Sequence, residues 1–252
     1  MEREQHQSDP AVNTNFDEFK QSFVDSLCHY EPILAAKAGL DHCDSVLVIP
    51  TNQLIAAQLL FQQEALKNLN NFKYDLLSYE NQRDYYWIKN IAENAVLSLS
   101  GMREWEWNPA IYNLQQEFEF ILRNEGKKLL YKLNGIKKKL EKVPEYYMQA
   151  KMNIVQPSEA HVKIAIRDLK NSLDFFNNEL PDSLQKVEDQ QLDKKSFLSD
   201  LSEASLALED FIGWLEKDVL PNLNSSLSTA YSIGKENYSM RFDSETNSIY
   251  SA

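Results

Sequence analysis

Two segments in the second half of the chain space their apolar residues alternately three and four positions apart. The first segment carries Val162, Ile166, Leu169, Leu173, Phe176 and Leu180, and the second carries Phe197, Leu201, Ala204, Leu208, Phe211 and Leu215. A repeat of 3.5 residues keeps one seam of a helix against a partner helix. The spacing therefore predicts a long antiparallel helical hairpin near the C-terminal end, joined across residues 181–193.

Helical patterns fill most of the remaining chain. One stripe runs from Phe16 to Tyr30, and further helices are expected from Asn52, from Ser78 and across the region that follows Ile111. Only 6 Gly and 8 Pro are present, too few for the turns of a multi-stranded β protein. We expect an all-α fold, an elongated bundle of about nine or ten helices, with Val46–Ile49 as an extended connector.

The chain begins with a polar stretch, residues 1–15, which we interpret as a tail or linker ahead of a single helical domain over residues 16–252. Asn15, with Glu18 three positions later, is typical of a helix N-terminal cap. A polar tail of this kind suits a tether between a membrane or lipid anchor and a folded domain. No signal peptide is expected within the given chain.

The net charge of −12 disfavours nucleic acid as a partner, because the protein's field repels phosphate backbones. A basic run between Lys127 and Lys142 departs from this balance, and we interpret it as a solvated helix face rather than an anion site. No stretch is apolar for long enough to span a bilayer. We therefore expect no transmembrane segment.

The sequence contains no complete catalytic or metal-binding motif. The nearest approach to a metal site is Cys28-His29 with His42-Cys43, but adjacent helical residues point about 100° apart and chelate poorly. The same two cysteines could form a disulfide, although two unpaired, partly buried thiols are the favoured expectation. No phosphate-binding glycine loop and no nucleophile elbow is present.

Aromatic residues gather around one predicted turn. Trp105, Trp107 and Tyr112 surround Asn108-Pro109, a pair that initiates turns, and Tyr146 follows in a later helix. Such rings can stack on a ligand or line a substrate channel, but more often they pack in the core with a polar tip in water. These four residues are the candidate substrate contacts.

Several segments in order resemble a bacterial family known as domain of unknown function 885. The segments are Pro32-x-x-Ala35 to Gly39 with Asp44-x-x-Leu47, Trp107-Asn108-Pro109-x-x-Tyr112, Leu140-x-x-Val143-Pro144-x-Tyr146-x-x-x-Ala150-x-x-Asn153-Ile154, Pro157-x-x-x-His161, and Ile233-Gly234-Lys235-Glu236-x-Tyr238. The chain departs from the family pattern at Asn108, where the family has Asp, and in its lysine-rich region 127–142.

Members of that family look like zinc-dependent peptidases with a His-Glu zinc helix in a C-terminal half. The resemblance implies that this chain is the helical N-terminal portion of such a hydrolase, that zinc belongs to the other half, and that no zinc ligand or catalytic residue lies here. It also implies a periplasmic or envelope-associated bacterial lipoprotein, while the sequence leaves a cytoplasmic location open.

Two functions remain after this reading. In the first, the helical domain shapes a substrate cleft for peptides together with the C-terminal catalytic half of the same protein, and it is inactive alone. In the second, it is a stand-alone helical module of the cell envelope that binds a protein partner or ligand through the hairpin or the aromatic turn.

Overall fold

The computed structural model describes residues 8–187, 192–223, 234–235, 238–239 and 241–242. Of these described residues 82% are helical, and none of them lies in a strand. The predicted all-α fold is therefore confirmed. No helix within the described ranges combines the length and the apolar character needed to cross a bilayer.

The chain divides into two compact units, whereas the sequence favours one domain over residues 16–252. Unit 1 comprises residues 1–30, 53–103 and 233–252, and unit 2 comprises residues 31–52 and 104–232. Each unit is therefore made of segments that are distant in sequence.

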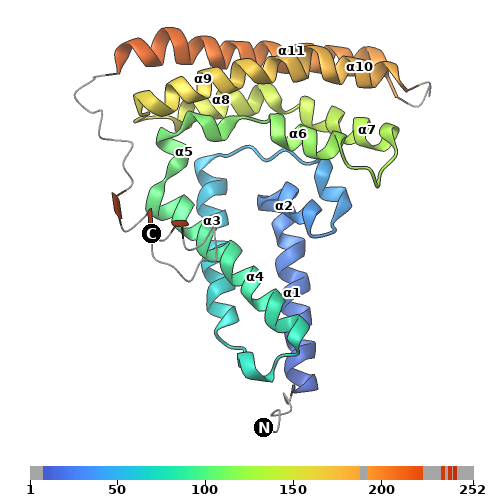
Figure 1. Ribbon diagram of the computed structural model, residues 1–252, viewed down its shortest axis with the longest axis vertical. Helices are drawn as coiled ribbons and strands as arrows, with labels where there is room; N and C mark the ends of the chain where they lie inside the picture. Colours follow the sequence, from blue (N-terminus) through green and yellow to red (C-terminus); the bar gives the residue numbers. More distant parts are fainter. Residues whose placement is uncertain (1–7, 188–191, 224–233, 236–237, 240, 243–252) are drawn as a thin grey trace. The chain divides into compact units, whose positions relative to one another are not determined.

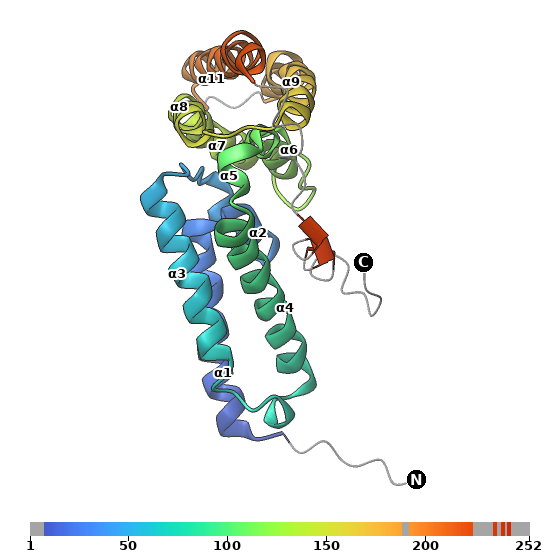
Figure 2. The same ribbon diagram turned by 90° about the vertical axis from the view of Figure 1, so that its left-hand side faces the viewer.

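Unit 1 is built on three long helices that run side by side (Figure 2). These are α1 (Pro10–Tyr30), α3 (Asn52–Leu69) and α4 (Tyr79–Val96), with a short 3-10 turn η2 (Tyr74–Leu76) before α4 and a π-helical turn η3 (Leu97–Met102) after it. Phe16 and Phe23 of α1 are buried, and the Phe23 ring stacks on Phe61 of α3 at 5.3 Å. The apolar stripe predicted from Phe16 to Tyr30 thus forms the core face of α1.

Unit 2 contains the remaining elements, and its core extends from Leu47 to Leu215. Its helices are α2 (Pro32–Lys37), η1 (Asp41–Ser45), α5 (Glu104–Trp107), η4 (Pro109–Tyr112), α6 (Gln115–Leu122), α7 (Leu129–Leu140), α8 (Val143–Asn153), α9 (Glu159–Asp174), η5 (Phe175–Glu179), α10 (Leu180–Gln185), α11 (Lys194–Trp214), η6 (Leu215–Val219) and η7 (Leu220–Asn222).

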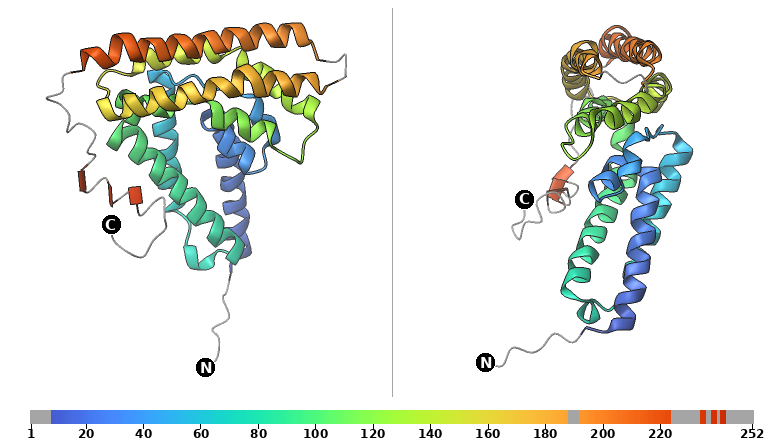
Figure 3. Two further views of the ribbon diagram at one scale, coloured as in Figure 1. Left: turned by 45° about the horizontal axis from the view of Figure 1, so that its top comes forward. Right: turned by 90° about the vertical axis from the view of Figure 1, so that its right-hand side faces the viewer.

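The predicted hairpin is present in unit 2. The continuous helical segment from α9 through α10 lies beside α11 (Figures 1 and 3), and α9 also contacts η6 and η7 at the far end of α11. The two segments are therefore antiparallel, and their heptad positions such as Leu169 and Leu208 are buried between them. α11 packs against α8 as well, so the seam belongs to a larger bundle.

Helix boundaries differ from the predictions at three places. α1 begins at Pro10 rather than after Asn15, because Asp9 Oδ1 accepts a hydrogen bond from Ala11 N at 2.8 Å and caps the helix. The sequence predicts that the helix starting at Ser78 ends at Gly101, but the π-helical turn η3 carries it to Met102, and Arg103 follows with a left-handed φ of 50°. The hairpin's first arm continues through Pro181 to Gln185, since the π-helical turn η5 places this proline in the first turn of α10.

The extended connector over Val46–Ile49 is confirmed, as is the helix start at Ser78, whose side chain accepts a hydrogen bond from Asn81 N. The segment 104–107, expected as a loop, forms the single helical turn α5. A last helix, which the sequence predicts over Leu227–Phe242, lies largely outside the described residues.

Candidate functional site

The aromatic turn, which we define as α5 and η4 with Trp105, Trp107 and Tyr112, is fastened to the loop between α8 and α9. Val155 N donates a hydrogen bond of 2.9 Å to the carbonyl of Glu106, and Ser158 N donates one of 3.3 Å to the carbonyl of Trp107. Asn108 Oδ1 accepts from Ala110 N at 3.1 Å, which initiates η4 at Pro109. Backbone bonds thus fix the turn on both sides.

Tyr112 is a structural residue of this turn. Its ring is 2% exposed, its hydroxyl donates a 2.7 Å hydrogen bond to the Trp105 carbonyl, and it accepts one of 3.2 Å from Asn153 Nδ2. Asn153 Nδ2 also donates to the Pro50 carbonyl at 2.8 Å. Burial raises the pKa of Tyr112 to about 12, so the hydroxyl stays protonated at neutral pH.

Trp105, Trp107 and Tyr146 are half-buried. The Tyr146 ring meets the Tyr112 ring edge-on at 5.9 Å, and burial raises the pKa of Tyr146 well above its usual value. The structure therefore groups all four sequence candidates in unit 2. Three of them are half-buried, whereas Tyr112 is buried.

His161, in the first turn of α9, extends the aromatic surface. Its ring lies edge-to-face against Trp107, with centroids 4.9 Å apart, and its Nδ1 is 2.8 Å from Ser158 Oγ. Burial lowers the pKa of His161, an effect that the negative charge of nearby Glu104 opposes. When the ring is neutral, its Nδ1 can accept a hydrogen bond from the Ser158 hydroxyl, and the ring packs beside Trp107.

A serine, a histidine and a buried glutamate together suggest nucleophilic catalysis, but the geometry argues for a helix cap. Ser158 is 4% exposed, and its Oγ accepts from the His161 backbone N–H as the N-cap of α9. A substrate carbonyl needs an exposed nucleophile with the base placed to take its proton. Ser158 and His161 therefore position the aromatic turn against α9 rather than attack a substrate.

The alternative metal group of Cys28, His29, His42 and Cys43 does not fit zinc. Both cysteines are disulfide-bonded and neither is a free thiol, so the favoured expectation of two unpaired thiols is wrong. Zinc binds thiolates, and a disulfide sulfur offers none. His29 packs its ring edge-on against Tyr30 at 4.9 Å.

Several lysines of the basic run are held by hydrogen bonds and ion pairs, whereas Lys128 and Lys138 lie on the exposed face that the sequence predicts. Lys127 Nζ contacts Asp44 Oδ2 at 2.7 Å and Asp41 Oδ1 at 2.8 Å, and Lys139, fully buried, pairs with Glu117. Lys132 Nζ donates to the carbonyl of Leu122 at 2.6 Å, at the negative end of the α6 dipole. Lys137 and Lys142 are also paired with carboxylates. These lysines leave little free positive charge for an anionic ligand.

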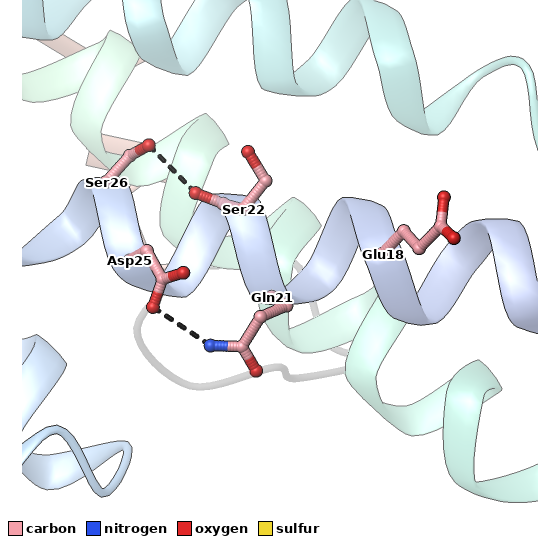
Figure 4. Close-up of a pocket in the computed structure, with 5 residues that line it drawn as sticks. All are labelled: Glu18, Gln21, Ser22, Asp25 and Ser26. Carbon is pink, nitrogen blue, oxygen red and sulfur yellow. Dashed lines mark hydrogen bonds between the residues drawn. The ribbon is translucent and has the colours of Figure 1, made fainter.

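Two surface hollows carry no site. One follows a single face of α1, where Gln21 bonds to Asp25 and Ser26 bonds to the Ser22 carbonyl within the same helix (Figure 4). The other, in unit 2, is lined in part by Phe120 and Arg123, whose guanidinium is paired with Glu119 and Glu179. Local partners satisfy the charges there.

Sequence reasoning missed Asn153, Ser158 and His161 as parts of the site. In the sequence analysis, Asn153 and His161 stand only in segments that resemble the family. Their contacts with the aromatic turn join positions more than forty residues apart, which periodicity does not reveal. The available signal was the Pro157-Ser158 start, which places His161 in the first helical turn.

Comparison with protein families gives a match over residues 32–252 to a family described as bacterial protein of unknown function (DUF885). Comparison with curated proteins gives no match. The matched region includes all of the aromatic turn and the hairpin.

A solved structure, described as a candidate lipoprotein of unknown function from Shewanella oneidensis, shares the fold with a TM-score of 0.78 and 24% identity. The alignment covers 94% of this chain and 43% of that one. This chain thus spans less than half the length of the structure it matches.

Proposed function

Because the chain belongs to the bacterial family of proteins of unknown function DUF885, we propose that it forms the helical, non-catalytic portion of a larger zinc-dependent peptidase of the cell envelope. In this role its aromatic turn borders the path of a peptide substrate. The catalytic half of the same protein supplies the zinc and the groups that act on the peptide bond.

The observation that carries this proposal is the coverage of the Shewanella structure. That protein shares the fold of nearly all of this chain and continues for more than half of its length beyond the aligned part. A helical portion with no exposed nucleophile paired to a base in its described site fits a scaffold better than a complete enzyme. The description of the Shewanella protein as a candidate lipoprotein supports the envelope location.

The chemistry of the aromatic turn suits peptide binding. Trp105, Trp107 and Tyr146 are half-buried aromatic residues, and the Trp105 carbonyl is held by buried Tyr112, which is itself bonded to Asn153. Rigid aromatic surface binds a ligand with little loss of side-chain entropy. A peptide with apolar or aromatic side chains is therefore the class of ligand that this surface fits.

The peptide-binding role is tested by titrating the chain into a fluorescein-labelled extended peptide rich in Leu and Phe and following fluorescence anisotropy. Trp107→Ala should weaken binding by at least about fivefold, because it removes the half-buried ring that lies against His161. Tyr131→Ala is the matched control, since Tyr131 is an aromatic ring 46% exposed on α7. Equal binding by the natural chain and the Trp107 variant would refute the role.

A second candidate, a stand-alone interaction module, is favoured by one observation. Met148 and Met152, 60% and 68% exposed, lie one turn apart on one face of α8, and Val155, 63% exposed, follows the end of that helix. Such a stripe serves either a separate protein partner or the rest of the family fold. The genomic reading frame beyond Ala252 distinguishes them: a stop codon there supports the module, and a continuing frame with a His-Glu zinc helix supports the scaffold.

A further inference from the structure

Three tyrosine rings meet at the turn between α3 and α4 in unit 1. Tyr74 of η2 lies edge-on to Tyr85 and Tyr86 of α4, with ring centroids 5.6 and 5.1 Å apart, and the two α4 rings lie edge-on to each other at 6.1 Å. We name these three residues the tyrosine cluster. Tyr86 is 57% exposed, and Tyr74 and Tyr85 are half-buried. The cluster therefore presents aromatic surface to solvent, chiefly through Tyr86.

The tyrosine cluster stands on a fixed base. The Tyr85 ring stacks on Phe16 of α1 at 6.3 Å, and Phe16 is fully buried. Gln82 Nε2 donates a hydrogen bond of 3.1 Å to the Tyr74 carbonyl, which holds η2 against the first turns of α4. Rings that are already held in place lose little side-chain entropy when a ligand binds.

Negative charge exceeds positive charge around the cluster. The start of α1 is joined to η2, because Asp9 N donates a hydrogen bond of 2.9 Å to the Leu76 carbonyl. Residues 9–20 and 64–86, which contain this part of α1, the end of α3, η2 and the start of α4, carry seven Asp or Glu residues and four Lys or Arg residues. The excess of negative charge attracts a cation and repels an anion.

Two of these carboxylates lie beside the cluster in sequence. Asp75 follows Tyr74 directly, and Glu80 lies in the first turn of α4. Both are exposed, and neither forms an ion pair with a Lys or Arg in the part of the chain that the structure describes. Lys73 and Arg83, also exposed, are included in the count above, and the excess of carboxylates remains.

We propose that the tyrosine cluster binds a Lys or Arg side chain of a basic peptide segment. A cation is attracted to the face of a tyrosine ring by the quadrupole of the ring, and the exposed carboxylates of Asp75 and Glu80 add to that attraction. An apolar ligand gains only from the rings and an anionic ligand is repelled, so the acidic surroundings favour a cationic one. The inference uses residues of unit 1 alone and does not depend on the peptidase role proposed above.

The test follows the fluorescence anisotropy of two labelled peptides as the full chain is added. One peptide alternates Lys with Gly, and in the other each Lys is replaced by norleucine, which has the lysine side chain without its ammonium group. At an ionic strength of about 0.05 M, where screening is weak, the lysine peptide should bind at least about tenfold more tightly than the norleucine peptide.

Two variants distinguish the cluster from the net charge of the whole chain. Tyr86→Leu keeps an apolar side chain but removes the exposed ring, and it should weaken binding of the lysine peptide by at least about threefold. Asp75→Asn combined with Glu80→Gln alters only exposed side chains and should weaken binding by a similar factor. Tyr131→Leu, which removes a ring that is 46% exposed on α7, is the matched control and should leave binding unchanged.

Equal binding of the two peptides would overturn the inference, since it would show that the ammonium group is not recognised. Binding of the lysine peptide to Tyr86→Leu as tightly as to the natural chain would also overturn it, because the net charge of the chain would then account for the attraction. The circular dichroism of each variant should match that of the natural chain, which separates a lost contact from a lost fold.

Discussion

Tyr112 is the residue on which the aromatic turn depends most. Its buried hydroxyl joins α5, through the Trp105 carbonyl, to Asn153 at the end of α8. Tyr112→Phe keeps the ring but leaves these two polar groups without that partner, which costs about 1–3 kcal/mol. We therefore expect the free energy of unfolding, measured with urea, to fall by that amount.

The control for this prediction is Tyr131→Phe, which removes the same hydroxyl from a ring that is 46% exposed. Water replaces the lost interaction there, so the free energy of unfolding should stay within about 0.5 kcal/mol of the natural value. Equal losses for the two variants would show that Tyr112 has no special role in holding the turn.

His161 makes stability depend on pH. Burial lowers its pKa in the folded chain below the ordinary value of 6.5, despite the opposing charge of Glu104. As the pH falls below 6.5, the unfolded chain takes up this proton first, so the free energy of unfolding decreases until the folded pKa is reached. His161→Asn keeps an acceptor near Ser158 but removes the titration.

The measurement compares urea denaturation at pH values of about 7.5 and about 5.5, on either side of the ordinary histidine pKa. The natural chain should lose more stability on acidification than the His161→Asn variant. If the variant loses as much, His161 titrates normally, and its ring is not buried against Trp107 as described.

Single residues of the site could be predicted only in part. Trp105, Trp107, Tyr112 and Tyr146 were recognisable from their type and their nearness to a turn. Which of them is fully buried depends on packing between helices. Tyr112 is buried, whereas the other three are half-buried. The disulfide state of the cysteines was not predictable either, because spacing in sequence does not give the distance between two sulfur atoms.

At the scale of elements, Ser158 is both the N-cap residue of α9 and a contact of the His161 ring in the site. Ser158 Oγ accepts from the His161 backbone N–H and lies beside the His161 ring. Ser158→Ala should lower the free energy of unfolding by about 1 kcal/mol through loss of the cap. Ser199→Ala, an exposed serine in the first turns of α11, should change it by less than about 0.5 kcal/mol. Equal urea midpoints for the natural chain and Ser158→Ala would contradict this assignment.

Helix identity was predictable, and helix ends were less so. The heptads around Leu169 and Leu208 predicted the hairpin because burial on one side enforces a regular period. Two helices end later than the sequence predicts because of π-helical turns. The turn η3 carries α4 beyond Gly101, and the widened turn η5 accommodates Pro181 at the start of α10. No propensity in the sequence indicates such a widening.

At the scale of the whole molecule, the division into two units was beyond sequence reasoning. Unit 1 combines α1 with α3 and α4, while unit 2 takes α2 and η1 from between them. Helical periodicity shows which face of each helix is buried but not which neighbour buries it. The assignment of helices to units therefore depends on three-dimensional contacts.

The central claim is that this chain is a non-catalytic portion whose metal and chemistry lie elsewhere in the family fold. Elemental analysis of the purified, dialysed chain tests it most directly. The account predicts less than about 0.1 zinc per chain, because both cysteines are disulfide-bonded and offer no thiolate to a metal. One tightly bound zinc per chain would contradict it.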